Sequence, residues 1–356
     1  MERQIYPYAR KVLFKFYPET AHTISMHSLE TLASTPLAGR MLQSHLRVDD
    51  SRLSQNLFST HLRFSNPVGL SAGVDKNAQF LRMANMIGAG FHEVGAVTPK
   101  PQGGNPKPRI FRYPQYNVMI NGLGFNNQGL DAVQQRLMHK HPAAIPVGVN
   151  VGKNKWTVNA IDDYIAVVRG LQGHCDYLTI NVSSPNTKGL RDLQTVDFLR
   201  EVVSKTKSLT HNPVLVKLAP DLKVDFAVEL AKEAVSAGAA GMVLTNTTLD
   251  HRGVDEKHPV AGGLSGRLLE SQSEKMLHEV AKELFGKIIL IGVGGISEGT
   301  GALSRLENGA SLIQLYTALV YKGPSVIHEI NSWLLHALEV CKFDNVREFI
   351  GSNLRK

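Results

Sequence analysis

From about residue 68 onward, the chain alternates between short apolar runs and segments whose apolar residues recur at helical spacing. This alternation constrains the fold more than any other feature. The apolar runs are hydrophobic almost throughout, as expected of parallel strands buried on both faces. Eight such strands with their helices predict an α/β protein with a (β/α)8 TIM barrel, and an open doubly wound sheet is the alternative. The predicted strands are Val68–Gly73, Phe91–Val97, Ile145–Val151, Tyr177–Ser183, Val214–Pro220, Gly241–Thr247, Ile288–Gly294 and Ser311–Thr317.

Polar residues gather at the carboxyl ends of five predicted strands. In a barrel these ends meet on one face, which carries the active site. One such residue alone would more often cap the following helix, but the repetition over five strands predicts a binding site. The residues are Asp75, Lys76, Asn150, Lys153, Asn181, Ser183, Ser184, Asn186, Lys217, Thr245, Asn246 and Thr247.

Glycine-rich turns follow the last two predicted strands. Gly292–Gly295 closes the seventh strand and Tyr316–Thr317 closes the eighth, while Gly262–Gly266 offers further backbone donors. The loops after strands seven and eight of many barrels hold a phosphate by their N–H groups. Glycine suits such a loop because its backbone can approach the anion closely. These turns therefore predict a phosphate site.

Two further features indicate chemistry. Lys217 stands inside an apolar strand, where a lysine is unfavourable unless it meets a negative charge or loses its proton; a lysine reaching out from the barrel rim is the structural alternative. The segment from Asn181 to Asn186 offers amide donors and acceptors that suit a planar, amide-rich ligand. Ser184 has no histidine partner in a triad order, but it can accept a proton if water relays that proton onward.

About 45 residues precede the predicted barrel and read as two helices, the second starting after Pro18. An apolar stripe opposite a basic face is typical of a helix at a membrane interface, and a helix packed on the barrel is the alternative. The apolar stripe of the first helix consists of Ile5, Tyr8, Val12, Leu13 and Phe16, and its basic face of Arg3, Arg10, Lys11 and Lys15.

Two segments interrupt the strand–helix repeat. The segment 99–121 carries five prolines and is predicted to form an excursion over the barrel mouth that contains a small hairpin. The segment 249–264 is predicted to be a mobile loop, and long loops at a catalytic face often act as lids.

Charge and composition exclude several classes. The net charge of +8 favours anionic partners without choosing among them, and the basic residues are too scattered to predict nucleic-acid binding. No apolar run reaches the about 18 residues that a membrane span requires. Cys175 and Cys341 lack metal or redox spacing, so we predict reduced thiols and no metal site.

Eight segments of the chain resemble the dihydroorotate dehydrogenase family, and the resemblance runs from Tyr6 to Pro324. The segments are SAGVDK (71–76), INGLGFNN (120–127), GVNVGKNK (148–155), INVSSPNTKGLR (180–191), KLAPDL (217–222), TNTT (245–248), GGLSGR (262–267) and IGVGGI (291–296). Their length and number make a chance match untenable.

The resemblance implies a barrel that binds FMN and oxidises dihydroorotate to orotate in pyrimidine biosynthesis. A hydride passes from C6 of the substrate to N5 of the flavin, and a base removes the proton from C5. In the quinone-reducing class of the family this base is a serine, which falls on Ser184. The cytosolic class, which reduces fumarate or NAD, has a cysteine there, so Ser184 indicates the quinone class.

The resemblance also assigns binding residues. Those for the substrate are Lys76, Asn121, Gly122, Leu123, Gly124, Phe125, Asn181, Asn186, Asn246 and Thr247. Those for FMN are Ala72, Gly73, Ala96, Asn150, Asn181, Lys217, Thr245, Gly266, Gly295, Tyr316 and Thr317. At Ala96 the family has a threonine whose hydroxyl touches FMN, and Thr98 is the candidate to replace that hydroxyl.

The N-terminal extension is a further mark of the quinone class, in which it forms an apolar tunnel to the flavin. The polar groups of the quinone end fall on His22 and Arg112. We therefore expect an extension over residues 1–45, an FMN-binding barrel over 46–340 and a C-terminal tail over 341–356. The resemblance implies a peripheral protein on the cytoplasmic side of the inner membrane. The alternatives are another FMN barrel, such as a tRNA dihydrouridine synthase, and a phosphate-binding sensor barrel.

Overall fold

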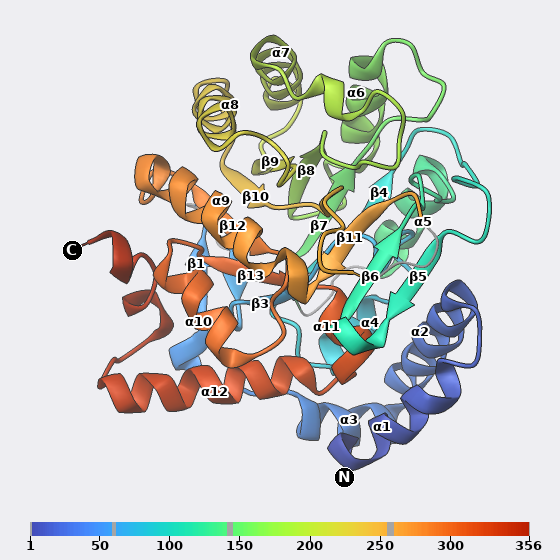
Figure 1. The fold of residues 1–356 in the computed structure, drawn as a ribbon, viewed down its shortest axis with the longest axis vertical. Helices are drawn as coiled ribbons and strands as arrows, with labels where there is room; N and C mark the ends of the chain where they lie inside the picture. The colour runs from blue at the N-terminus through green and yellow to red at the C-terminus, as the bar shows by residue number, and fades with distance from the viewer. Residues whose placement is uncertain (1, 59–61, 141–144, 255–259, 356) are drawn as a thin grey trace.

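Eight parallel strands form a closed barrel surrounded by helices (Figure 1), which confirms the predicted (β/α)8 architecture over the open sheet. The structure is a computed structural model that describes residues 2–58, 62–140, 145–254 and 260–355, apart from the side chains of residues 2–5 and 140. In sequence order, which is also their order around the barrel, the strands are β3 (Val68–Leu70), β4 (His92–Val97), β7 (Val147–Val151), β8 (Tyr177–Asn181), β9 (Val214–Leu218), β10 (Gly241–Leu244), β12 (Ile289–Val293) and β13 (Leu312–Leu315).

The strands are shorter than predicted, mainly at their carboxyl ends. β8 ends at Asn181 instead of Ser183, because the N–H of Ser183 donates to the Asn181 side chain and leaves the strand ladder. β10 likewise ends at Leu244, before the polar segment that begins at Thr245. The polar residues predicted at the strand ends therefore lie on the loops above the barrel.

Helices cover the outside of the barrel, and buried side chains fill its amino-terminal end. The helices that follow the barrel strands are α4 (Leu81–Met86), α5 (Leu130–Lys140), α6 (Ala160–Leu171), α7 (Val196–Lys207), α8 (Val224–Ser236), α9 (Glu270–Leu284), α10 (Gly299–Glu307), α11 (Thr317–Lys322) and α12 (Val326–Cys341). The hairpin of β1 (Gln55–Leu57) and β2 (Leu62–Phe64) contributes Phe64 to an aromatic cluster with Phe91 and Tyr177. Phe349, in the tail after α12, is buried against the outer core.

A second, three-stranded antiparallel sheet lies beside the barrel mouth (Figure 1). β5 (Ile110–Tyr113) and β6 (Val118–Asn121) form the hairpin predicted within 99–121. β11 (Gly263–Gly266) pairs with β6, so the end of the predicted loop 249–264 is a strand. The middle of that loop, residues 255–259, lies outside the described residues.

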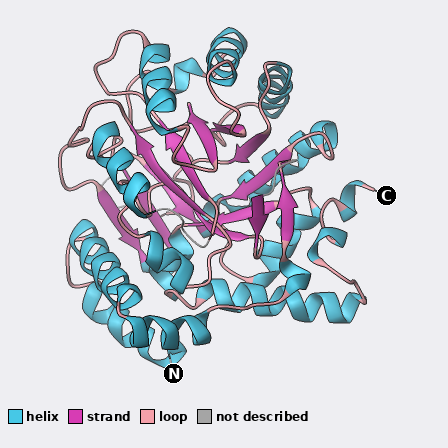
Figure 2. Cartoon of the chain, turned by 180° about the vertical axis from the view of Figure 1, so that it is seen from behind, coloured by secondary structure: helices cyan, strands magenta, loops and turns pink. Residues whose placement is uncertain are grey.

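Three helices, one more than predicted, precede the barrel: α1 (Glu2–Leu13), α2 (Pro18–Ser34) and α3 (Pro36–Leu46). They gather at one lower corner, seen from the front in Figure 1 and from behind in Figure 2. α2 packs against α4. No helix in the described ranges is long and apolar enough to cross a membrane.

The predicted faces of α1 are partly wrong. Arg10 does not lie on an exposed basic face, because its Nη1 donates to the Tyr321 carbonyl at 2.6 Å. The Tyr6 hydroxyl donates to the Val320 carbonyl at 2.8 Å, so both residues anchor α1 to α11. Among the predicted apolar residues, Tyr8, Val12 and Phe16 are exposed, whereas Leu13 faces a cavity. The side chains of Arg3 and Ile5 lie outside the described residues.

Candidate functional site

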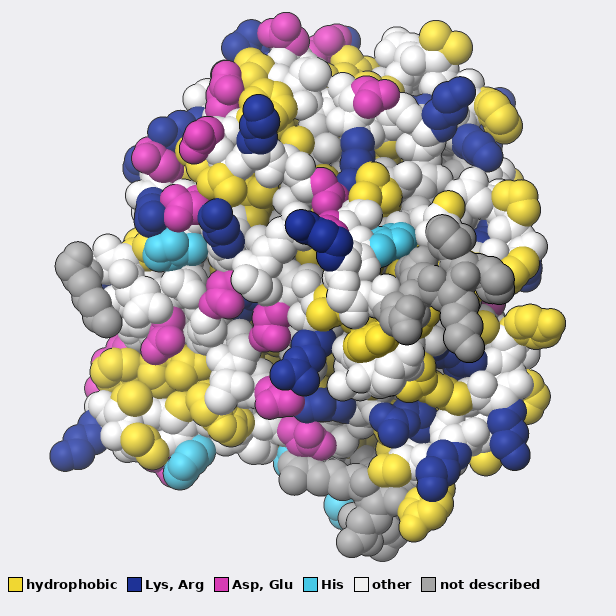
Figure 3. All heavy atoms as spheres, in the orientation of Figure 1, with side chains coloured by type: hydrophobic (Ala, Val, Ile, Leu, Met, Phe, Trp, Pro, Cys, Tyr) yellow, Lys and Arg dark blue, Asp and Glu magenta, His cyan; other side chains and the backbone are white. Residues whose placement is uncertain are grey.

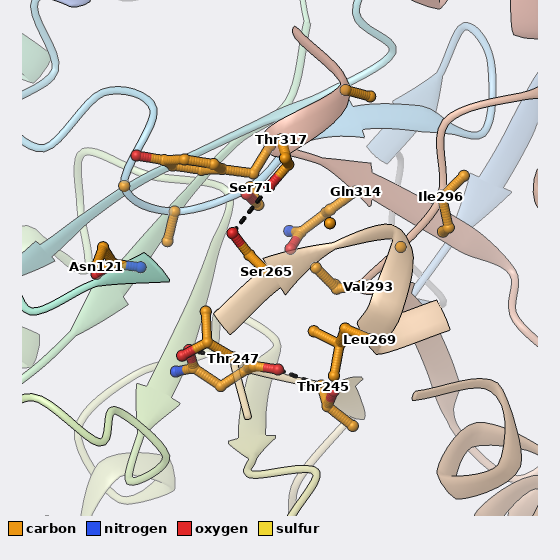
Figure 4. A pocket seen from close by; sticks show the side chains of 18 of the residues that line it. Ser71, Asn121, Thr245, Thr247, Ser265, Leu269, Val293, Ile296, Gln314 and Thr317 are labelled. Atoms are coloured by element: carbon orange, nitrogen blue, oxygen red, sulfur yellow. Dashed lines mark hydrogen bonds between the residues drawn. The ribbon is translucent and has the colours of Figure 1, made fainter. Parts of the chain in front are cut away.

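A cavity of about 560 Å³ lies at the carboxyl ends of the barrel strands and is lined by most of the predicted site residues. Figure 4 shows Ser71, Asn121, Gln314 and Thr317 around this cavity, which we call the main cavity. The predicted residues that line it are Ala72, Gly73, Lys76, Ala96, Asn121, Leu123, Gly124, Phe125, Asn181, Ser184, Asn186, Lys217, Thr245, Asn246, Thr247, Gly266, Gly295, Tyr316 and Thr317.

Gly122 and Asn150, which the resemblance assigns to substrate and FMN, are not part of this lining, and neither are the predicted strand-end residues Asp75, Lys153 and Ser183. Asn150 is fully buried behind Asn181, whose Nδ2 donates to the Asn150 side-chain oxygen at 2.8 Å. Asn150 therefore supports the lining rather than forming it. Conversely, Gln314 lines the main cavity although no sequence pattern singled it out.

The segment after β8 forms an amide-rich end of the main cavity. The Ser184 hydroxyl oxygen, nearly buried, accepts the Asn186 N–H at 3.3 Å. The Asn186 amide donates in turn to Asn121 Oδ1 at 3.1 Å. Within the described residues, no histidine or carboxylate bonds to Ser184, which agrees with the absence of a hydrolase triad. This end can therefore orient a planar ligand beside a hydroxyl group.

A half-buried lysine lines the same cavity. Lys76 Nζ donates to the Gly73 carbonyl at 2.8 Å. Burial lowers the pKa of Lys76 to about 8, although the carboxylates of Glu19 and Asp75 oppose that shift. Glu19, from α2, is held by Arg109, whose Nη2 lies 2.8 Å from its Oε1. The site thus contains a cation that can pair with an anionic ligand at neutral pH.

Lys217 projects from β9 into the interior of the barrel and lines the main cavity. Burial lowers its pKa, and the carboxylate of Glu93 on β4 opposes the shift. The predicted negative partner of Lys217 is therefore present. The alternative of a lysine reaching out from the rim does not hold, because Lys217 is 5% exposed.

A glycine cradle closes the opposite end of the main cavity. Gly295 has a positive φ, and a Cβ there would lie 2.4 Å from the Cα of Glu270. A Cβ on Gly266 would lie 2.2 Å from the Asn117 carbonyl oxygen. Arg305 secures this loop by donating to the carbonyls of Gly294 at 3.0 Å and Glu270 at 2.8 Å. Only glycine permits this backbone approach, which is the arrangement a phosphate group needs.

Thr98 does not replace the hydroxyl that is missing at Ala96. Thr98 Oγ1 donates to the Lys100 carbonyl at 2.8 Å and accepts from the side chain of Asn127 at 2.8 Å. It is absent from the lining of the main cavity, whereas Ala96 lines it. The expected replacement is wrong because these partners hold Thr98 on the loop behind the strand.

A second cavity of about 420 Å³ lies between the N-terminal helices and the barrel. Its lining is mostly apolar and includes the predicted residues His22 and Arg112. Burial lowers the pKa of His22 to about 4, so its imidazole is neutral at physiological pH. Arg112 Nη2 donates to the Phe16 carbonyl at 2.6 Å, just beyond the end of α1, and therefore also fixes that helix.

The two cavities adjoin. The residues that line both are Lys76, Leu123, Asn126 and Tyr316. A ligand in the second cavity would therefore be separated from one in the main cavity by no more than these side chains.

Fold and site together define a class: a TIM-barrel enzyme with a cofactor-sized cavity over the carboxyl ends of its strands. A family model described as dihydroorotate dehydrogenase matches residues 53–338. The chain belongs to the dihydroorotate dehydrogenase family.

Individual relatives support this assignment along the whole chain. A protein of a Nitratiruptor species named dihydroorotate dehydrogenase (quinone) is 44% identical over 355 residues, covering 98% of this chain and 99% of its own. A Corynebacterium striatum protein of the same name is 40% identical over 357 residues, covering 98% of both chains. The crystal structure of DHODH from Eimeria tenella in complex with ferulenol matches with a TM-score of 0.82 at 38% identity, over 91% of this chain and 96% of that one.

Proposed function

We propose that this protein oxidises dihydroorotate to orotate, with FMN as its flavin and a quinone as the electron acceptor. One observation carries the proposal: Ser184 and its amide neighbours line a cavity that adjoins a second, apolar cavity under the N-terminal helices. An acceptor that differs in polarity from the substrate would need such a separate site. The quinone relatives named above and the serine at position 184 support this choice of acceptor.

The residues present fit FMN. The glycine cradle at Gly266 and Gly295 suits its phosphate, and Lys217 provides a cation inside the barrel. The chemistry that FMN supplies is acceptance of a hydride from C6 of dihydroorotate at N5, followed by electron transfer to the quinone. A nearby cation such as Lys217 favours the negatively charged reduced flavin.

The chain's own residues would bind the substrate and move its proton. The amides of Asn121, Asn186 and Asn246 offer both donors and acceptors to the ring of dihydroorotate. Lys76 would pair with its carboxylate. Ser184 Oγ would accept the proton from C5 while its own hydroxyl proton passes to a water molecule, which relays it onward.

We further propose peripheral contact with the cytoplasmic face of the inner membrane through α1 to α3. Apolar side chains are exposed along this N-terminal region, including Tyr8 at 70%, Tyr17 at 80% and Leu37 at 74%. In the space-filling view, hydrophobic and basic side chains alternate at the lower right, where α1 and α2 lie (Figure 3). This surface adjoins the second cavity, so a quinone could reach it from the bilayer.

Anaerobic mixing tests the proposed function directly. Dihydroorotate should bleach the flavin absorbance of the purified protein, and a quinone should restore it much faster than fumarate or NAD. No bleaching would refute the substrate. Reoxidation by fumarate or NAD at the quinone rate would refute the acceptor.

The pKa of Lys76 predicts a pH dependence. Lysine is charged below its pKa, so the apparent kcat/KM for dihydroorotate should be constant below a pH of about 8 and fall by about tenfold per unit above it. Steady-state assays from about pH 6 to about pH 10 measure this profile, a range that spans the ordinary and shifted lysine pKa values. Lys76→Met should have a low kcat/KM without the break, and a wild-type profile that stays flat across the whole range would contradict the assignment.

A further inference from the structure

A fully buried carboxylate stands inside the barrel, and its one role described so far is that of the negative partner of Lys217. Glu93 stands on β4 and is 0% exposed. A carboxylate inside a barrel is costly unless its oxygens are hydrogen-bonded and its charge is balanced. The contacts of Glu93 indicate what the protein gains from keeping it there.

Side chains from four other strands converge on the Glu93 carboxylate. Its Oε1 accepts the Asn150 amide at 2.8 Å, and its Oε2 accepts the Gln314 amide at 2.9 Å. Oε2 also accepts the Thr179 hydroxyl at 3.2 Å. Lys217 is close enough for its charge to interact with the carboxylate. Both oxygens of the Glu93 carboxylate are thus hydrogen-bonded, and the positive charge of Lys217 balances its negative charge.

A carboxylate can only accept hydrogen bonds, whereas an amide can present either its oxygen or its nitrogen. Glu93 therefore requires Asn150 to turn its NH2 group downward and its oxygen upward. That oxygen accepts the Asn181 amide at 2.8 Å, which fixes Asn181 in the same sense. The backbone N–H of Ser183 also donates to Asn181 Oδ1 at 3.1 Å, so the orientation of both amides is held from above as well, and any residue that replaces Glu93 must offer an acceptor to the Asn150 NH2 group.

The same donor-to-acceptor direction of the hydrogen bonds continues to the amide-rich end of the main cavity. Asn181 Oδ1 accepts the Ser183 hydroxyl at 3.0 Å, and the Ser183 oxygen accepts the Asn246 amide at 2.9 Å. Asn246 Oδ1 then accepts the Thr247 N–H at 2.8 Å. We call Asn150, Asn181, Ser183 and Asn246 the amide chain. Every hydrogen bond that links its members runs in one direction, toward the anion.

Gln314 forms a second branch. Because its NH2 group donates to Glu93, its Oε1 is the free end of the amide. This oxygen is buried, and no described residue donates to it. Gln314 lines the main cavity (Figure 4), so its Oε1 is available to accept a hydrogen bond from a ligand there.

We propose that Glu93 is a positioning residue: its carboxylate accepts the NH2 groups of Asn150 and Gln314 at once, and it thereby fixes the orientation of the Gln314 amide. This orientation sets whether Gln314 donates or accepts toward substrate and flavin. Its charge also partly offsets that of Lys217 and so tunes the flavin. The choice of orotate as the test ligand rests on the proposed function.

The variant Glu93→Gln keeps the shape of the side chain but removes the charge and the acceptor-only character. In the variant the new amide must offer its oxygen to Asn150 and its NH2 group to Gln314, so Gln314 turns its own NH2 group toward the ligand. The flavin-loaded variant should therefore bind orotate at least about tenfold more weakly in an absorbance titration, since a misdirected buried amide discriminates strongly. Its flavin midpoint potential should rise, because loss of a nearby anion favours the reduced, negatively charged flavin.

A double variant provides the rescue. In Glu93→Gln/Asn150→Asp the acceptor-only group moves up by one position, so the amide at position 93 can donate to it and keep its oxygen for the Gln314 NH2 group. Orotate affinity should recover most of its loss, while Asn150→Asp alone should bind weakly because it places two carboxylates together. Thr179→Val is the matched control: it removes one partner of Glu93 but leaves the Gln314 amide directed, so its affinity should stay within about twofold of wild type.

The affinities of these variants for orotate decide whether Glu93 is a positioning residue. Wild-type affinity for orotate in Glu93→Gln, or a double variant weaker than both single variants, overturns the positioning role. If Glu93→Gln alone does not fold, the double variant must still fold and bind orotate, and its failure overturns the role equally. A wild-type protein that binds flavin but no orotate overturns the proposed function instead, and this proposal with it.

Discussion

Replacing Ser184 with alanine should slow flavin reduction by dihydroorotate by about 100- to 10,000-fold, the usual contribution of a positioned general base. The hydroxyl lies at the amide-rich end of the main cavity, where its oxygen accepts the Asn186 N–H. Alanine removes the proton acceptor and leaves the neighbouring amides in place. Anaerobic stopped-flow measurement of flavin absorbance gives the rate directly.

Binding must survive in this variant for the role to be catalytic. Ser184→Ala should retain its flavin and bind orotate with nearly wild-type affinity. Ser183→Ala is the informative comparison, because the Ser183 hydroxyl links Asn181 to Asn246 within the amide chain. That variant should lose affinity for orotate more than maximal rate. A Ser184→Ala protein that is reduced at the wild-type rate would exclude Ser184 as the base.

The barrel and most of the cavity lining could be predicted because both follow from local patterns. Strands buried on both faces are apolar throughout, and polar residues at their carboxyl ends must meet on one face. The strand ends could not be predicted equally well. Val182 and Ser183 extend the pattern of β8, but the Asn181 side chain captures the backbone and ends the ladder.

Glu93 marks a limit of reasoning from single strands. A charged residue within an apolar strand is the signal that points to Lys217, and Glu93 satisfies that rule equally well. Its partner Gln314 lies 221 residues away in the sequence, on the strand β13. Such a pairing depends on how the closed barrel brings β4 and β13 together, which strand patterns alone do not specify.

The N-terminal helix illustrates a different limit. Its apolar and basic residues indicate an amphipathic helix but not which face packs on the barrel. The sequence groups Arg10 with the exposed basic residues, yet its guanidinium donates a hydrogen bond to the Tyr321 carbonyl. Backbone carbonyls near the end of α11 thus decide the orientation of α1. They lie 311 residues from Arg10 and 314 residues from Tyr6 in the sequence.

A bulky side chain in the second cavity should separate the two half-reactions. Ser25 lies on α2 and lines the second cavity but not the main one. A tryptophan there would occupy space that the quinone needs. We expect this clash to raise the free energy of quinone binding by more than about 1.4 kcal/mol, which corresponds to a tenfold loss of affinity. Ser25→Trp should therefore reduce the rate of flavin reoxidation by quinone more than tenfold, while flavin reduction by dihydroorotate stays unchanged.

The same helix offers a matched control. Ser28 is about one turn further along α2, is exposed and does not line the second cavity. Ser28→Trp introduces the same side chain without narrowing the cavity, so both half-reactions should keep their wild-type rates. Equal quinone rates in Ser25→Trp and wild type would place the acceptor elsewhere. Equal losses in both variants would mean that tryptophan disturbs α2 itself, and the second cavity would then lose its support as the quinone site.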